Sequence, residues 1–208
     1  MKKENRQEPF RFKRDSIVRM NLAKGLEPYR HDSLFTQSPQ NVNSPWQNAD
    51  DSALLHRETV QTAFQYPFAL NLNECKGKTF KRNAGARGKV NGLKFILKAI
   101  GELNSVAGNH ARSYYEMAPA SIVIRLSESL VAGYDTYGFT KDGDFPEVID
   151  GIKQDDYPGN EFYIGGKIVK TMAEEKQSAL CAKGVTLDRS AQRLITTVTA
   201  HILGEEQA

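Results

Sequence analysis

The segment that most constrains the fold is an amphipathic helix followed, after a basic loop, by an apolar strand. Between Gly92 and Ala107, apolar residues recur at spacings of three and four, with charged residues between them. This pattern predicts a helix with one buried face, and Gly108 with Asn109 is a natural stop. Ser121 to Leu126 holds three apolar residues in a row and predicts a strand. A helix packed beside a strand indicates a mixed fold of the α+β class.

The remaining elements are predicted from shorter patterns. Val60 to Leu72 alternates with period two, so we expect a long strand from Glu58 to Leu72, with an edge, bulge or break at Pro67. The other expected elements are a strand within Ile17–Leu22, a short helix over Phe145–Ile152, a turn at Gly165-Gly166, and a helix over Ser190–Leu203 with Asp188 as a candidate cap. Phe64, Tyr66 and Phe68 are expected to pack in the sheet or core.

The charge of the chain is small in sum but unevenly distributed. The formal net charge is +3, yet residues 2–24 carry eight cations against three acids, and residues 76–89 carry six cations and no acid. The stretch 128–175 is acidic by contrast. Such asymmetry indicates a polyanionic partner on one face. A solvated basic face without a partner is the alternative.

Several classes of function find no support in the composition. Cys75 and Cys181 lie far apart and form no metal or disulfide pattern, so we expect a reduced, cytoplasmic setting. No apolar run approaches ~20 residues, so we expect no membrane span. The glycines at 85–88 and 165–166 do not match a phosphate loop, and the acids between Asp142 and Asp156 do not match a calcium loop. We therefore expect no metal and no cofactor.

Two loops carry residue types that suit single-stranded RNA. The loop before the Ser121 strand combines Asn109, His110 and Arg112 with Tyr114 and Tyr115. Cations suit phosphates, and rings suit stacked bases. His110 also allows a different hypothesis, in which it is the general base of a metal-independent endoribonuclease.

The second loop, residues 30–53, is a long polar insertion that contains Phe35 and Trp46 and shows no convincing period. A loop of this length is either functional or a tolerated surface insertion. Its rings argue against a plain linker.

At GNHARSYYEMAPASIVIRL, residues 108–126, the chain resembles the backbone subunit of type I CRISPR effector complexes (Cascade), in the type I-B and DevR branch of the RAMP superfamily. The GNHAR segment followed by the A-P-x-S-I-V strand is the most specific match. Weaker matches follow the same order: LEPYRHD (26–32), LHRE (55–58), YGF (137–139) and IGG (164–166). The resemblance runs from about Arg11 onward.

This resemblance implies an α+β fold: a partial RRM-like (ferredoxin-like) palm with an antiparallel sheet and two main helices. Residues 1–208 would form one palm domain, with a mobile basic arm at 1–10, a thumb-like insertion at 27–57 and a C-terminal helical region at 140–208. The chain would match the later two-thirds of the family, without the N-terminal part that supplies the first strand and helix of the palm.

The implied function is to bind guide crRNA along its phosphate backbone, without catalysis, for antiviral defence. The implied partners are the guide, target DNA paired to it, neighbouring copies of the same subunit, other Cascade subunits and a complementary N-terminal half. Phe35 and Trp46 would separate bases. The expected RNA-binding residues are Asn109, His110, Arg112, Ser113, Arg19, Lys24, Arg30, His31, His56 and Arg57.

Two other functions are compatible with the same residues. One is the metal-independent RAMP-type endoribonuclease that processes guide RNA. The other is a truncated regulatory remnant that binds a protein partner by strand addition at an open sheet edge.

Overall fold

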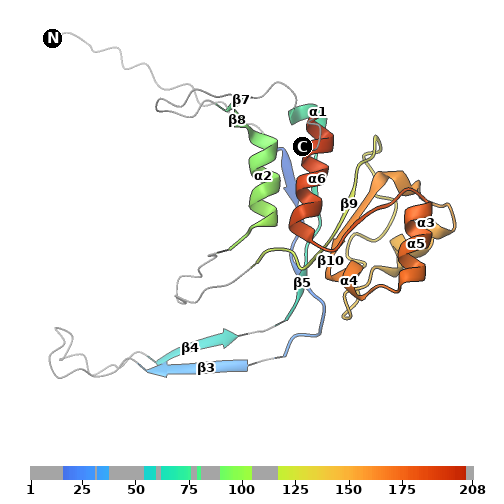
Figure 1. The fold of residues 1–208 in the computed structure, drawn as a ribbon. Helices are drawn as coiled ribbons and strands as arrows, with labels where there is room; N and C mark the ends of the chain where they lie inside the picture. The colour runs from blue at the N-terminus through green and yellow to red at the C-terminus, as the bar shows by residue number, and fades with distance from the viewer. Residues whose placement is uncertain are drawn as a thin grey trace, which may run out of the picture.

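The computed structural model describes residues 16–30, 32–37, 54–59, 62–75, 79–80, 90–104 and 117–204 (Figure 1). The strands are β1 (Val18–Met20), β2 (Lys24–Gly25), β3 (Asp32–Gln37), β4 (Leu54–Thr59), β5 (Phe64–Gln65), β6 (Phe68–Leu70), β7 (Thr79–Phe80), β8 (Val90–Asn91), β9 (Ser121–Arg125), β10 (Phe162–Gly166) and β11 (Thr186–Asp188). The helices are α1 (Leu72–Cys75), α2 (Gly92–Gly101), α3 (Pro146–Lys153), the 3-10 turn η1 (Gly159–Glu161), α4 (Lys167–Thr171), α5 (Glu174–Ala182) and α6 (Ala191–Leu203).

The C-terminal part of the chain is built around a three-stranded sheet in the order β11-β10-β9. Strand β10 is antiparallel to β9 but parallel to β11, because α4 and α5 form the crossover between β10 and β11. Every residue of β10 is buried. The mixed arrangement confirms the predicted α+β class and is consistent with a partial RRM-like palm.

The prediction of a turn at Gly165-Gly166 was wrong, because both glycines lie in strand β10. A Cβ at Gly165 would stand 2.8 Å from the side chain of Leu194, and one at Gly166 would stand 2.2 Å from the Ala120 carbonyl oxygen. Gly166 also has a φ of +93°. Gly165 therefore allows close packing against α6, and Gly166 allows the positive φ at the start of α4. A larger residue is disfavoured at both positions.

Two hydrophobic clusters hold this part together. One cluster fills the space between the sheet, α3, α4 and α5, and includes Phe162 and Ile164 at 0% exposure. The other lies on the opposite face of the sheet, where α2 and α6 pack together and against Ile122 and Tyr163. The residues of β9 alternate between the two clusters, as expected for a strand with both faces covered.

Helix α6 matches its predicted span and α2 is shorter than predicted. Ser190, rather than Asp188, caps α6, since its hydroxyl accepts a hydrogen bond from the Arg193 amide at 3.3 Å. Helix α2 ends at Gly101 instead of Ala107. At Gly101 the helix lies so close to α6 that a Cβ would meet Ile195 at 3.1 Å, and the chain turns away directly after it.

The N-terminal part is a narrow ribbon of short strand pairs, in which β1 pairs with β6 and β2 with β5. The long strand predicted from Glu58 to Leu72 is broken into β4, β5 and β6. The break before β6 falls at Pro67, which has no amide hydrogen to donate but whose carbonyl accepts from Asn21 at 3.1 Å.

The arms of the polar insertion form an antiparallel hairpin, β3–β4, which extends away from the rest of the described chain (Figure 1). This segment shows no convincing period, so its residues alone did not predict these strands, whereas the resemblance implied a thumb-like insertion here. An isolated two-stranded ribbon has no core that would impose strict alternation of apolar residues.

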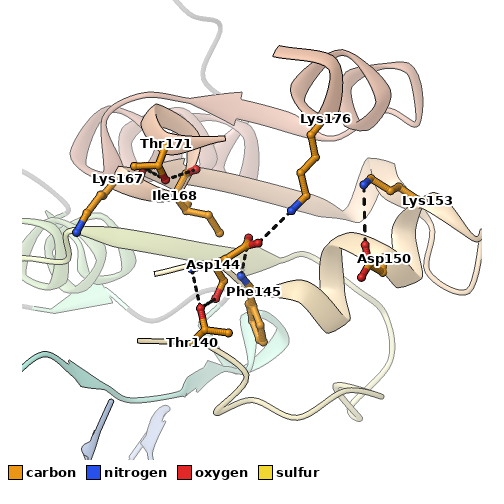
Figure 2. Close-up of polar contacts among 9 residues, drawn as sticks. All are labelled: Thr140, Asp144, Phe145, Asp150, Lys153, Lys167, Ile168, Thr171 and Lys176. Atoms are coloured by element: carbon orange, nitrogen blue, oxygen red, sulfur yellow. Dashed lines mark hydrogen bonds and ion pairs between the residues drawn. The ribbon is translucent and has the colours of Figure 1, made fainter. Parts of the chain in front are cut away.

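Some acidic side chains of the stretch 128–175 form ion pairs with lysines of the same chain. Lys176 of α5 reaches Asp144 at 3.0 Å, and the other Asp144 oxygen accepts from the Phe145 amide at 2.9 Å (Figure 2). Lys183 likewise pairs with Asp155. In the described ranges no three His, Cys, Asp or Glu side chains cluster as a metal site would require. Nor is any helix of those ranges long and apolar enough to cross a bilayer.

Candidate nucleic-acid interface

Half of the predicted RNA-binding residues cannot be placed. Arg19, Lys24, Arg30, Phe35, His56 and Arg57 lie in described segments. The residues that fall outside the described ranges are His31, Trp46, Asn109, His110, Arg112 and Ser113, together with the loop tyrosines Tyr114 and Tyr115. The structure therefore leaves the role of the 108–116 loop as a prediction.

The three placed cations follow one another along the ribbon and are together called the basic strip. Arg19 lies in β1 opposite Ala69, Lys24 lies in β2 opposite Gln65, and Arg30 lies two residues before the first residue of β3. All three are exposed. The strip thus leads from the body of the molecule to the base of the hairpin.

The hairpin brings predicted residues of its two arms into register. Phe35 pairs with His56, and Leu34 pairs with Arg57, across the antiparallel ladder. These positions are far apart in the sequence, and the pairing of β3 with β4 makes them neighbours. Phe35, which was predicted to separate bases, and His56, which was predicted to bind RNA, are therefore neighbours across the ladder.

A hydrogen bond ties the base of the hairpin to the basic strip. The Tyr29 hydroxyl donates to Glu58 Oε2 at 3.3 Å. Desolvation and then the neighbouring Glu58 carboxylate raise the pKa of Tyr29 above its usual value of 10.0, so the hydroxyl keeps its proton at neutral pH. This pair was not predicted, because a contact between residues 29 positions apart leaves no local pattern in the sequence.

A second anchor joins the ribbon to the loop that follows β9. The Lys24 ammonium lies 5.7 Å from the centroid of the Tyr137 ring, and the Tyr137 hydroxyl donates to the Leu22 carbonyl at 2.7 Å. The Phe139 amide donates to Gln65 Oε1 at 3.0 Å. Lys24 is thus held at a defined place while its charge stays in solvent.

Arg125 of β9, by contrast, is mostly buried and bonded within the protein. Its Nε donates to Glu161 Oε2 at 2.7 Å, and its Nη1 donates to the Ala132 carbonyl. The guanidinium also lies 5.3 Å from the centroid of the Phe162 ring. This cation is structural and is not available to a phosphate.

The arrangement suits contact with a polyanion. Exposed cations in a row beside a projecting hairpin can follow a phosphate backbone. His201 is the one histidine whose side chain is described, and its Nδ1 lies 3.3 Å from the Tyr163 hydroxyl, on the surface of α6.

Comparison with known proteins gives one informative similarity. No protein-family model matches the chain. Over 173 residues the chain is 24% identical to a protein of Myxococcus xanthus (strain DK1622) described as CRISPR-associated protein Cas7/Cst2/DevR. The aligned region is 80% of this chain and 53% of that protein, so the chain spans about half the length of the curated relative it matches.

The fold and this similarity together give weak support to one class. A mixed α+β domain with a basic ribbon and a projecting hairpin is compatible with a RAMP-type protein. The weak homology supports a CRISPR-associated protein of the Cas7 family within the RAMP superfamily. It does not distinguish the type I-B branch from other branches.

Proposed function

We propose that this chain is a non-catalytic backbone subunit of a type I CRISPR effector complex and binds guide crRNA along its phosphates. The observation that carries the proposal is the strip of exposed cations that leads to the base of the β3–β4 hairpin. The similarity to a CRISPR-associated protein supports guide crRNA as the polyanion that the strip binds.

In this proposal the basic strip holds the RNA backbone, and the hairpin enters between bases. Arg19, Lys24 and Arg30 each neutralise one phosphate and release its counterions. Phe35, in register with His56 on the hairpin, supplies a ring that separates neighbouring bases. Sequence recognition is left to pairing between guide and target DNA.

The same proposal sets the partners and the setting of the protein. Further copies of the subunit would continue the RNA-binding path along the guide, and other subunits of the complex would supply the nuclease. We propose that this assembly is cytoplasmic. We also propose that the 108–116 loop, with His110 and Arg112, contacts the guide backbone.

A charge-matched binding experiment tests the proposal. One variant replaces Arg19, Lys24 and Arg30 by Ala, and the control replaces Lys153, Lys170 and Arg189, which are exposed on the C-terminal part. Both lose three charges. We expect the first variant alone to lower the affinity for a repeat-spacer RNA and to reduce the slope of log K against log salt by about two. Equal losses of RNA affinity in both variants would mean that the strip contributes only general electrostatic attraction, and would contradict the proposal.

A precursor RNA that contains the repeat tests the proposed absence of catalysis. Precursor RNA incubated with the chain in the absence of metal should stay intact at the repeat. Cleavage that is lost in His110→Ala would replace the proposal by the endoribonuclease hypothesis.

A further inference from the structure

A loop of the C-terminal part, residues 135–145, contacts the ribbon at two places and is called the anchor loop. The Tyr137 hydroxyl donates to the Leu22 carbonyl at 2.7 Å. The Phe139 amide donates to Gln65 Oε1 at 3.0 Å. The first bond reaches the chain just before β2, and the second reaches β5, which pairs with β2. The anchor loop therefore holds both strands of one short ladder.

The two contacts meet at the cross-strand pair of Lys24 and Gln65. Directly opposed residues of a ladder place their side chains on the same face. That face is turned toward the anchor loop, because Gln65 accepts from the backbone of the loop and the Lys24 ammonium lies 5.7 Å from the centroid of the Tyr137 ring. Lys24 nevertheless stays exposed. The middle cation of the basic strip is thus held on one side and open to solvent on the other.

The β2–β5 ladder itself supplies little of this order. Strands β2 and β5 contain two residues each, and a two-stranded ribbon is marginally stable at best. A lysine side chain on its own samples many rotamers, and it loses this freedom when it binds a phosphate. The position of Lys24 therefore depends on the anchor loop more than on the strand that carries it.

The anchor loop has a fixed shape at the end that carries Tyr137. The Tyr137 amide donates to Asp135 Oδ1 at 2.8 Å, and the Gly138 amide donates to the Asp135 carbonyl at 3.1 Å. The Asp135 amide donates in turn to Glu147 Oε2 of α3 at 3.2 Å. These bonds fix the backbone that carries the Tyr137 ring.

The far end of the anchor loop is joined to α5. The Thr140 amide donates to the Asp144 carbonyl at 2.9 Å and closes the loop. Asp144 Oδ1 accepts from the Phe145 amide, and Oδ2 accepts from Lys176 Nζ at 3.0 Å (Figure 2). Phe145 is 3% exposed and belongs to the larger hydrophobic cluster. The loop thus connects the C-terminal core to the surface on which Lys24 lies.

We propose that Tyr137 and Gln65 are positioning residues of the basic strip: through the anchor loop they hold Lys24 in the place where it meets a phosphate. The inference rests on the proposed function. A cation that is already ordered loses less conformational entropy on binding, so the anchor raises the affinity for RNA without adding a contact. The number of phosphates neutralised, and with it the salt dependence of binding, is set by the cations alone.

RNA binding by a double variant tests this inference. Tyr137→Phe with Gln65→Met removes both hydrogen bonds between the ribbon and the anchor loop and keeps the ring and every charge. The matched control, Tyr157→Phe with Gln192→Met, removes the same two groups from the C-terminal part, where both side chains donate to backbone carbonyls. Lys24→Ala is the reference for the loss of a cation. The affinity of each full chain for a repeat-spacer RNA is measured over a series of salt concentrations.

We expect the Tyr137→Phe/Gln65→Met variant, but not its control, to bind the RNA about threefold to tenfold more weakly. The slope of log K against log salt should stay at the value of the unsubstituted chain. Lys24→Ala should lower the affinity and also reduce that slope by about one.

Three results would contradict this account. Equal affinities of the double variant and its control would overturn the inference, and the proposed function would stand if Lys24→Ala still lowers the affinity. A slope that falls in the double variant as it does in Lys24→Ala would also overturn the inference, because the phosphate contact itself would then be lost. An unchanged affinity and slope in Lys24→Ala would overturn the proposed function, and the inference with it.

The anchor is also tested without RNA. The Leu26 amide donates to the Ala63 carbonyl at 2.9 Å, beside the β2–β5 ladder. Its hydrogen exchange should be about threefold faster or more in the double variant than in the control. Unchanged exchange would overturn the inference whatever the affinity for RNA, because the anchor loop would then not order β2.

Two charge-matched variants test the far end of the loop. Asp144→Asn weakens the ion pair with Lys176, whereas Asp142→Asn removes the same charge from an exposed position two residues away. Loss of a negative charge by itself strengthens the attraction for RNA in both variants. We expect Asp144→Asn to bind the RNA about twofold more weakly than Asp142→Asn, because the loop is loosened. Equal or tighter binding by Asp144→Asn would overturn the link from the core to Lys24.

Discussion

The N-terminal ribbon and the C-terminal part of the chain differ in how they are stabilised. Within residues 16–30 and 62–73 no residue is buried, whereas the largest fully buried side chains all lie between Val148 and Val198. The ribbon is held by short ladders and by single contacts such as those of Tyr29 and Tyr137. Burial of apolar area is the main source of stability, so the C-terminal part holds itself together while the ribbon depends on what it contacts.

This difference assigns the two regions different tasks. A region with its own core can hold a site at a fixed place, and a region without one can adapt to a long ligand. The exposed cations at 19, 24 and 30 lie on the ribbon, and the buried clusters lie behind it. Changes in the C-terminal core should therefore alter stability, and changes in the ribbon should alter binding.

The largest effect is expected from Phe162→Ala. Phe162 is 0% exposed at the centre of the larger cluster, so its removal should lower the free energy of unfolding by about 3–5 kcal/mol. The ribbon control is Leu22→Ala, which removes a side chain that is 86% exposed and should change stability by less than about 0.5 kcal/mol. Urea unfolding measures both, and similar losses would contradict the contrast between the regions.

A smaller but specific effect is expected from Gly166→Ala. Its Cβ would meet the Ala120 carbonyl at 2.2 Å, and φ is +93°. We expect a loss of about 3 kcal/mol, of which about 1–2 kcal/mol is backbone strain. Gly143→Ala isolates the strain, because Gly143 has a φ of +83° but nothing within 4 Å of its Cβ. Equal losses in the two variants would show that strand β9 yields to the new methyl group.

These two regions also show what the sequence could and could not predict. The period of α6 and the apolar run of β9 are local patterns, so both elements were predicted closely. Gly165-Gly166 was misassigned because its reason, contact with Leu194 and Ala120, is not local. The Tyr29–Glu58 bond joins segments that are adjacent only after the hairpin forms. Predicted ligands such as Arg19 were found exposed, while those at 109–113 lie outside the described residues.

The start of α6 provides a pH-dependent prediction. Arg193 donates to both Asp188 oxygens and holds the pKa of Asp188 below its usual value of 3.8. A depressed carboxyl pKa stabilises the fold above the unfolded pKa, and this contribution is lost as the pH falls through the folded pKa. Asp188→Asn should cost about 1 kcal/mol at pH 7 and flatten the acid side of the stability profile. Asp142→Asn, in an exposed loop, is the control; an equal change there would contradict the assignment.

The smallest effect is expected from Tyr137→Phe. The change removes the hydrogen bond to the Leu22 carbonyl but keeps the ring beside Lys24. We expect a loss of about 0.5 kcal/mol, because the hydrogen bond is exposed and neutral, seen as faster amide exchange in residues 18–25 with no change in β10. Exchange that also accelerates in β10 would mean that the ribbon and the C-terminal core open as one unit.

The measurement that tests the central claim most directly is amide exchange by mass spectrometry with and without a repeat-spacer RNA. If the ribbon is the RNA-binding region, bound RNA should slow exchange in segments 16–30 and 54–59 and leave segment 145–204 unchanged. Protection confined to segment 145–204, with the ribbon exchanging at its free rate, would contradict the account.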